Sequence, residues 1–218
     1  MQKIIITGSK GIIGTILTQG LQESYEITGL DLPEADLTEI QTLIKVAEGK
    51  SAIIHLAWDT HAGDNINLQN HRMFKNVYQA ALDFNIPRVI IASSVHADGF
   101  LSHDESRLLS PNEAPTPNST YGVNKIAMET MGEYFAAQGL EVVCIRFGGV
   151  SHNNEPRQGE KEGLVFLDQR DTVSLIKAIL SAEVIPNNFI VLYAVSDNAG
   201  IIHDISNPFG WVPKYGLR

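Results

Sequence analysis

The sequence contains little cysteine, no long apolar run and no excess of positive charge, and each shortage excludes a class of protein. Its 218 residues include a single cysteine, Cys144, which excludes a disulfide framework and any cysteine-based zinc or iron–sulfur cluster. The formal net charge of −9 is opposite in sign to that of a phosphate-tracking surface, so we expect no nucleic-acid partner. The histidines are scattered without metal-ligand spacing, and we expect no metal.

No stretch approaches the roughly 18 consecutive apolar residues of a membrane-spanning helix, so no membrane association is expected. The apolar run that follows Lys3 is also too short for a secretory leader, which makes a cytoplasmic location the expectation. The length is typical of one domain, and we expect a single domain over residues 1–218.

Short β-branched apolar runs alternate with longer stretches that have helical periodicity. The runs predict strands over residues 3–7, 25–30, 52–56, 88–93, 141–147, 164–167 and 189–194. Spaced apolar positions predict helices over residues 12–21, 40–47, 67–84, 121–137 and 171–181. Strands that are apolar throughout are typical of a parallel sheet covered on both faces. The alternation therefore predicts an α/β fold, a Rossmann-like doubly wound parallel sheet.

A glycine-rich turn follows the first predicted strand. Gly8, Gly11 and Gly14 have the spacing G-x-x-G-x-x-G between a strand and a helix, which suits a pyrophosphate bound by backbone N–H groups at a helix N-terminus. Three turn glycines brought together by chance are the alternative. The cofactor contacts expected from this loop are Gly8, Lys10, Gly11, Ile12, Ile13 and Gly14.

An acidic residue, Asp31, ends the second predicted strand. Its carboxylate can accept hydrogen bonds from both hydroxyls of an adenosine ribose and would repel a 2′-phosphate. No arginine or lysine neighbours it in the sequence, so NAD is favoured over NADP as the cofactor. The alternative is that Asp31 only begins a turn before Pro33.

Tyr121 and Lys125 open a predicted helix and lie four residues apart, on the same helical face. An ammonium group beside a phenol favours the phenolate and so lowers the pKa of the phenol. The spacing therefore predicts that Tyr121 is a general acid or base near neutral pH, and that Lys125 also holds a ribose of the cofactor. A surface pair without function is the alternative.

Two serines and a histidine follow the fourth predicted strand, at the edge where ligands bind in such sheets. Ser94 is predicted to bind the substrate oxygen as the third catalytic group. Ser93 is predicted to cap the strand or to line the cofactor pocket. His96 is either a polar loop residue or a hydrogen-bond partner of the substrate.

With these motifs the chain resembles the extended short-chain dehydrogenase/reductase superfamily, which includes the NAD-dependent epimerases and dehydratases, and within it the uronate dehydrogenases. The matching segments are SSVHADGF at 93–100, YGVNK at 121–125, IRFGG at 145–149, DTVSLI at 171–176, YAVSDN at 193–198 and GWVPK at 210–214. The resemblance implies Ser94, Tyr121 and Lys125 as the catalytic set, with Tyr121 as the base. It also implies cofactor contacts at Asp36, Leu37, Leu56, Ala57, Trp58 and Asn70, and sugar-facing residues at Thr60, Ser94 and His96.

Several features differ from the pattern of the resembled family. Val95 replaces the asparagine that follows the second serine, and Trp58 stands where the family has a small residue. The arginine that binds the uronate carboxylate has no clear counterpart, and Arg157 and Lys161 are both candidates. The helical extension at the C-terminus of the family is also absent, so we expect a much reduced substrate lobe, with substrate-site elements from residues 94–119, 148–170 and 194–218.

These observations predict an NAD-dependent dehydrogenase that oxidises a hydroxyl of a sugar or of a uronate-like sugar acid, which is a small-molecule substrate. One alternative is a nucleotide-sugar epimerase or dehydratase, which usually needs a larger C-terminal lobe. Another is a non-catalytic NAD-responsive binding protein, a class that tends to lose the tyrosine or the lysine. The resemblance also suggests a homodimer that pairs helices 67–84 and 121–137.

Overall fold

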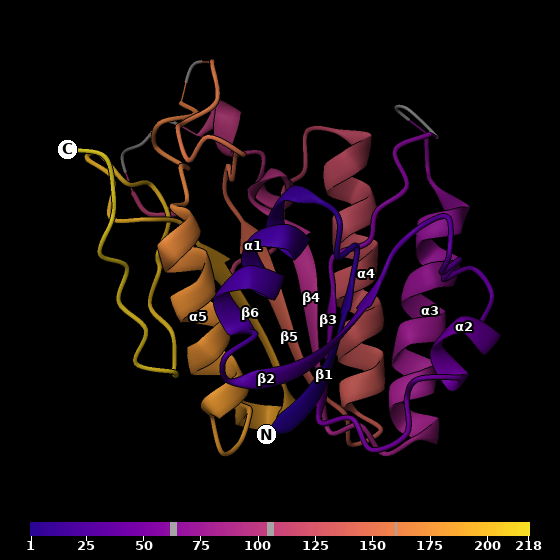
Figure 1. The fold of residues 1–218 in the computed structure, drawn as a ribbon. Coiled ribbons are helices and arrows are strands. Elements are labelled where there is room, and N and C mark those ends of the chain that lie inside the picture. Colours follow the sequence, from indigo (N-terminus) through magenta and orange to yellow (C-terminus); the bar gives the residue numbers. More distant parts are fainter. Residues whose placement is uncertain (62–64, 104–106, 160) are drawn as a thin grey trace.

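The computed structural model describes residues 1–61, 65–103, 107–159 and 161–218, which form a parallel sheet with helices on both faces (Figure 1). The six strands are β1 (Gln2–Thr7), β2 (Tyr25–Leu30), β3 (Ala52–His55), β4 (Arg88–Ser94), β5 (Glu141–Phe147) and β6 (Phe189–Ala194). The helices are α1 (Ile12–Leu21), α2 (Gln41–Ile44), α3 (Leu68–Asp83), α4 (Thr120–Ala136) and α5 (Gln169–Ser181). Short 3₁₀ helices are η1 (Val95–Asp98), η2 (Phe100–Ser102) and η3 (Pro186–Asn188).

The strand order β2-β1-β3-β4-β5-β6 changes direction between β1 and β3. Each strand pairs in parallel with its neighbours, so the carboxyl ends of all six lie at the same edge of the sheet. In doubly wound sheets, ligands bind in the crevice at this edge, beside the change of direction. The predicted α/β fold, a Rossmann-like doubly wound parallel sheet, is confirmed.

The strands are apolar throughout because both faces of the sheet are covered. In β1, Ile5 belongs to a core layer with residues of α3 and α4, whereas Ile4 and Ile6 belong to a layer with residues of α1 and α5. Successive strand side chains point to opposite faces, so each strand supplies both layers. This packing anchors the strand ends that carry the site.

Two predicted elements differ from those in the structure. Residues 164–167 do not form a strand: Phe166 makes one isolated bridge, to Gly149, because the segment lies among loops and not along a strand. The helix predicted over 40–47 is only the short α2, since the chain after it continues in turns such as the bond from Val46 N–H to Leu43 C=O. Strand β4 extends one residue further than predicted, to Ser94, and β3 ends one residue earlier, at His55.

The loops beyond the strand ends pack on one another in a third apolar cluster. Its buried members are Val95, Phe100, Leu109, Val165, Tyr193, Val195 and Ile202. They come from β6 and from the three segments predicted to supply the substrate site, although residues 104–106 and 160 of those segments lie outside the described residues. Within the described ranges, no helix is long and apolar enough to cross a membrane.

Candidate active site

The phosphate loop is shaped by close backbone contacts that exclude side chains. Gly8 has a φ of +66°, and a Cβ atom there would lie 2.7 Å from the backbone nitrogen of Ala57. A Cβ atom at Gly14 would lie 2.1 Å from the carbonyl oxygen of Gly8. Helix α1 begins after Gly11, which supplies no side-chain cap. The helix therefore directs backbone N–H groups and the positive end of its dipole toward the loop, which fits a bound pyrophosphate.

The first turn after β2 lies against this loop. The backbone N–H of Lys10 donates to Asp31 Oδ2 at 2.7 Å, while Lys10 Nζ donates to Glu34 Oε2 at 2.7 Å and to Leu32 O at 3.3 Å. The hydrogen bond to Glu34 raises the pKa of Lys10. Asp31 thus has a cation nearby in space although none neighbours it in the sequence. That lysine forms its ion pair with Glu34, and Asp31 adds a smaller attraction to the same ammonium.

Asp36, Leu37 and Asn70, three of the predicted cofactor contacts, lie outside the cavity described below. Leu37 is buried in the core, and Asp36 Oδ1 accepts hydrogen bonds from the backbone and side chain of Thr38. Asn70 of α3 is fully buried, with Oδ1 accepting from Asp59 N–H at 2.8 Å and Nδ2 donating to Asp59 C=O at 2.9 Å. Asn70 therefore fixes the segment after β3 that carries Trp58 and Thr60.

A histidine that sequence reasoning missed supports the same segment. Thr7 Oγ1 lies 2.6 Å from Nδ1 of the buried His55, and it accepts bonds from the backbone N–H groups of Leu56 and Ala57. Burial, followed by the charge of Lys125, lowers the pKa of His55 to about 3, so its ring is neutral at ordinary pH. Its place inside a short apolar strand gave no signal of this role.

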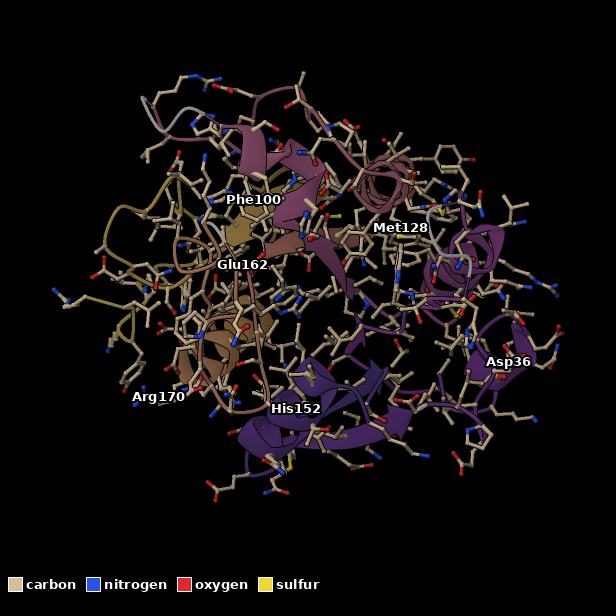
Figure 2. All side chains as sticks on the ribbon, turned by 90° about the horizontal axis from the view of Figure 1, so that it is seen from above. Asp36, Phe100, Met128, His152, Glu162 and Arg170 are labelled. Atoms are coloured by element: carbon tan, nitrogen blue, oxygen red, sulfur yellow. The ribbon has the colours of Figure 1, made fainter. Side chains whose placement is uncertain are left out.

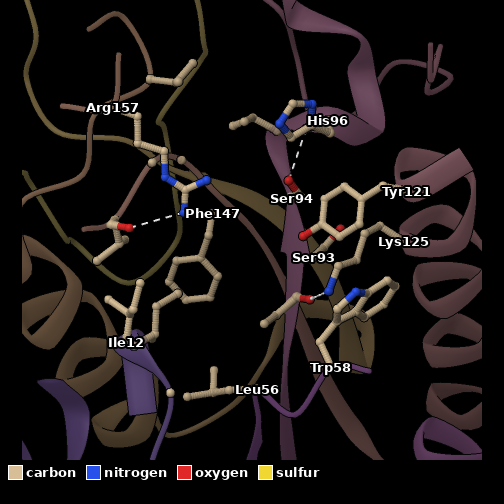
Figure 3. A pocket seen from close by; sticks show the side chains of 18 of the residues that line it. Ile12, Leu56, Trp58, Ser93, Ser94, His96, Tyr121, Lys125, Phe147 and Arg157 are labelled. Carbon is tan, nitrogen blue, oxygen red and sulfur yellow. Dashed lines mark hydrogen bonds between the residues drawn. The ribbon is translucent and has the colours of Figure 1, made fainter. Parts of the chain in front are cut away.

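A cavity of about 490 Å³ lies at the carboxyl ends of the strands (Figure 3). It brings together fourteen of the predicted residues, namely Gly8, Gly11, Ile12, Ile13, Gly14, Leu56, Trp58, Thr60, Ser93, Ser94, His96, Tyr121, Lys125 and Arg157. Seven other predicted residues do not line it: Lys10, Asp31, Asp36, Leu37, Ala57, Asn70 and Lys161. The lining residues that sequence reasoning did not name include Phe100, Phe147, Val150, Glu162 and Val165.

The side chain of Lys125 enters the cavity from α4 and is almost fully buried. Its Nζ donates to Ala92 C=O at 2.7 Å, lies 3.9 Å from the centre of the Trp58 ring and 5.4 Å from that of Tyr121 (Figure 3). Burial lowers the pKa of Lys125 to about 7, while the carboxylate of Glu129 opposes this fall. Lys125 is therefore a buried amine whose charge depends on its surroundings.

Tyr121 turns its hydroxyl toward Ser94, as Figure 3 shows. Burial raises the pKa of Tyr121, while a hydrogen bond with Ser94 and the charge of Arg157 oppose the rise. Contrary to the expectation from the sequence, Lys125 is not among the groups that shift the pKa of this phenol. The reason is geometric, because the Lys125 ammonium is directed at Ala92 C=O and at the Trp58 ring.

Ser94 and His96 lie at the end of β4, where it passes into η1. Ser94 Oγ accepts from His96 N–H at 3.2 Å and so caps η1. The His96 ring lies 5.7 Å from that of Tyr121, between centroids, and burial lowers the pKa of His96. A neutral imidazole beside a phenol and a hydroxyl can exchange hydrogen bonds with a substrate oxygen.

The two candidates for a substrate carboxylate are placed differently. Arg157 lines the cavity, and its Nη2 donates to Val150 C=O at 3.4 Å (Figure 3). Lys161 does not line the cavity, and its Nζ donates to the carbonyl of His103. The carboxylate of Glu162 also faces this end of the cavity, where it raises the pKa of His96 against the effect of burial. Figure 2 draws the described side chains, and among these residues no group of three or more His, Cys, Asp or Glu suits a metal ion.

The chain is similar in sequence and in fold to known dehydrogenases. A model of the NAD-dependent epimerase/dehydratase family matches residues 4–182. The NAD-dependent glucose-6-phosphate dehydrogenase of Haloferax volcanii is 27% identical, covering 90% of this chain and 86% of that protein. The uronate dehydrogenase of Pseudomonas putida is 29% identical, covering 97% and 84%. A crystal structure of a uronate dehydrogenase variant from Agrobacterium tumefaciens, complexed with NAD, has a TM-score of 0.86 at 26% identity and covers 99% of this chain and 85% of its own.

These findings confirm the predicted resemblance, the dehydrogenase class and the cofactor. The family model spans most of the chain, and the similarity to the NAD complex spans nearly all of it. The glycine loop and the helix start below it have the geometry that a dinucleotide needs. The chain belongs to the NAD-dependent epimerase/dehydratase family and is an NAD-dependent dehydrogenase of the short-chain dehydrogenase/reductase superfamily.

Proposed function

We propose that this protein oxidises a hydroxyl group of a sugar or sugar acid, with Ser94, Tyr121 and Lys125 as its catalytic residues. One observation carries the proposal: the phosphate loop and these three side chains line the same cavity. A binding protein that only senses NAD has no need of a phenol and a hydroxyl directed at the same point. Their presence favours catalysis over the non-catalytic alternative.

Tyr121 has the geometry of the base. Its hydroxyl faces Ser94, whose own hydroxyl can hold the reacting oxygen of the substrate. The Ser94 hydrogen bond and the Arg157 cation both favour the phenolate, in opposition to burial. NAD, held by the phosphate loop, would supply the acceptor for the hydride from the substrate carbon. Tyr121 takes the proton of the hydroxyl, and Lys125 is within the cavity to hold the cofactor ribose.

The far end of the cavity suits a polyhydroxylated substrate with a negative group. Thr60, His96 and Glu162 offer donors and acceptors for hydroxyls, and Arg157 offers a guanidinium that can bind a carboxylate or a phosphate through two hydrogen bonds. Two relatives named above are dehydrogenases of uronates and of glucose 6-phosphate, both of which are anionic sugars. We therefore assign the anionic group to Arg157 and not to Lys161.

The chain is proposed to act as one domain over 1–218, with residues 94–119, 148–170 and 194–218 supplying the substrate side. The suggested homodimer through α3 and α4 stays a prediction. An epimerase or dehydratase that acts on a nucleotide sugar is the alternative function, and it uses the same three catalytic residues.

The test is a screen for NADH formation, read by absorbance, with galacturonate, glucuronate, glucose 6-phosphate, neutral aldoses and polyols. We expect oxidation of at least one anionic sugar. Tyr121→Phe removes the proton acceptor, so it should lower kcat at least about 100-fold while NAD affinity changes less than about twofold. Tyr134→Phe, an exposed tyrosine on the same helix, is the matched control. Full activity of Tyr121→Phe would remove Tyr121 from the mechanism, and an inactive wild-type protein across the screen would reject the substrate class.

A further inference from the structure

A buried ionic cluster lies directly behind the catalytic residues. Arg146 of β5 is 2% exposed, and its Nη1 donates to the two oxygens of Asp98 at 2.9 and 2.8 Å. Its Nε and Nη2 donate to the two oxygens of Glu129 at 2.9 and 2.7 Å. The Tyr193 hydroxyl donates to Asp98, and the Ser93 hydroxyl donates to Glu129. We call Arg146, Asp98 and Glu129 the Arg146 cluster.

The Arg146 cluster holds two carboxylates and one guanidinium, so it has one negative charge in excess. Both carboxylates accept hydrogen bonds at each of their oxygens, which is the pattern of the ionised form. Burial raises the pKa of Asp98, whereas the charge of Arg146 and the hydrogen bond from Tyr193 oppose that rise. An unbalanced buried charge is costly, so a second cation is expected nearby.

Lys125 is the candidate for that cation. It lies one helical turn before Glu129 on α4, so the two side chains share a helical face. Among the residues with described positions, Lys125 forms no ion pair of its own, because its Nζ donates to a backbone carbonyl and lies over an aromatic ring. As an ammonium, Lys125 would balance the two carboxylates together with the guanidinium of Arg146.

Among the residues whose positions are described, the other groups around Lys125 supply no negative charge. His55 on β3 is neutral, Trp58 presents its ring, and Phe74 on α3 presents another at 6.0 Å. On α4 itself, the two titratable neighbours are Tyr121, one turn before, and Glu129, one turn after. Burial alone would favour the neutral amine, and Glu129 is the group that opposes it.

We propose that Glu129 is a positioning residue of this enzyme: its carboxylate, held in place by Arg146 and Ser93, keeps the Lys125 side chain a charged ammonium at the cofactor end of the cavity. The consequence for catalysis rests on the proposed function, in which Lys125 holds the cofactor ribose beside Tyr121. An ammonium offers three donors to the ribose, whereas a neutral amine offers fewer and carries no charge.

The test measures the protonation of Lys125 directly and needs neither NAD nor a substrate. Protein carrying ¹³C at the lysine Cε positions is titrated by NMR, and the Lys125 signal is assigned by its loss in Lys125→Met. Glu129→Gln keeps the size and hydrogen-bonding capacity of the side chain but removes its charge. We expect it to lower the pKa of Lys125 by about one pH unit, a tenfold smaller ratio of ammonium to amine.

Two further variants separate charge from packing. Glu129→Asp keeps the charge but shortens the side chain, and it should leave the pKa of Lys125 within about 0.3 pH units of the wild-type value. Glu133→Gln makes the same charge change one turn further along α4, at an exposed position, and should leave it unchanged. An unchanged pKa in Glu129→Gln, or an equal fall in Glu129→Asp, would overturn the proposal.

If Glu129→Gln does not fold, Asp98→Asn removes a carboxylate from the Arg146 cluster while Glu129 stays in place. The pKa of Lys125 should again fall, by less than in Glu129→Gln because Asp98 lies on the other side of Arg146. A constant pKa in that variant would overturn the proposal. Failure of the substrate screen would not, because this titration does not depend on turnover.

Discussion

His203 is a buried histidine that should make the protein sensitive to acid. It is 1% exposed and packs 4.5 Å from the Tyr193 ring, between centroids, where the C-terminal segment bridges to Leu109. Neither of its ring nitrogens has a hydrogen-bond partner within the part of the chain that the structure describes. Burial, followed by the charges of His103 and Arg146, lowers the pKa of His203 to about 3.

The size of the effect follows from proton linkage. A histidine in an unfolded chain titrates near pH 6.5, so between about pH 6.5 and 3 the unfolded chain binds one more proton at this residue than the folded chain does. The free energy of unfolding therefore falls as the pH falls, by about 1.4 kcal/mol for each pH unit. At pH 5 the loss from His203 is about 2 kcal/mol relative to pH 8.

His203→Leu removes this titration and places an apolar side chain against Phe100 and Tyr193. The free energy of unfolding is measured by urea denaturation at pH 8 and at pH 5. The stability of the variant relative to the wild type should rise by about 2 kcal/mol on going from pH 8 to pH 5. His152→Leu, which replaces an exposed histidine, is the control and should show no such rise. Equal pH dependence in His203→Leu and the wild type would refute the reasoning.

Three other predictions concern the cofactor. Gly14→Ala places a methyl group 2.1 Å from Gly8 O and should weaken NAD binding at least about tenfold, or ~1.4 kcal/mol, by calorimetric titration. Its control is Gly163→Ala, whose methyl meets Leu217 Cδ1 at 3.8 Å and no other described atom within 4 Å. Asp31→Ala should lower the ratio of the Kd for NADP to the Kd for NAD about tenfold, because one charge-assisted acceptor for the ribose is lost. An unchanged ratio would exclude Asp31 from the ribose site. Trp211→Phe leaves Trp58 as the sole tryptophan. In this variant, NAD should change the tryptophan fluorescence, because Lys125 turns from the Trp58 ring to the ribose. A constant signal would place Trp58 away from the cofactor.

Local patterns predicted the parts of the site that are built locally. The spacing of Gly8, Gly11 and Gly14 requires only the turn between one strand and the next helix, and the structure forms that turn with a left-handed Gly8. The shared face of Tyr121 and Lys125 requires only one helical turn. Both features could be predicted because their geometry depends on neighbours in the sequence.

The sequence alone could not predict the contacts between segments that are distant in the chain. Lys10 lies beside Asp31 because the loop after β1 folds over the end of β2, which no local pattern encodes. Arg157 and Lys161 are four residues apart in a segment without regular structure, and one lines the cavity while the other bonds to His103. Without a helical or strand period, the sequence offers no basis for choosing between them.

The error in the pKa of Tyr121 has the same origin and leads to a more general point. A Tyr-x-x-x-Lys motif places an amine near a phenol, but it does not decide whether the amine is charged or where it points. In this protein those properties depend on Ala92 from β4, Trp58 from the segment after β3, and Glu129 with its partner Arg146 from β5. The motif therefore identifies the two reacting groups, while the orientation and charge of Lys125 depend on other elements of the fold. A substitution at the Arg146 cluster should accordingly alter the pH dependence of turnover even though none of its members touches Tyr121 in this structure.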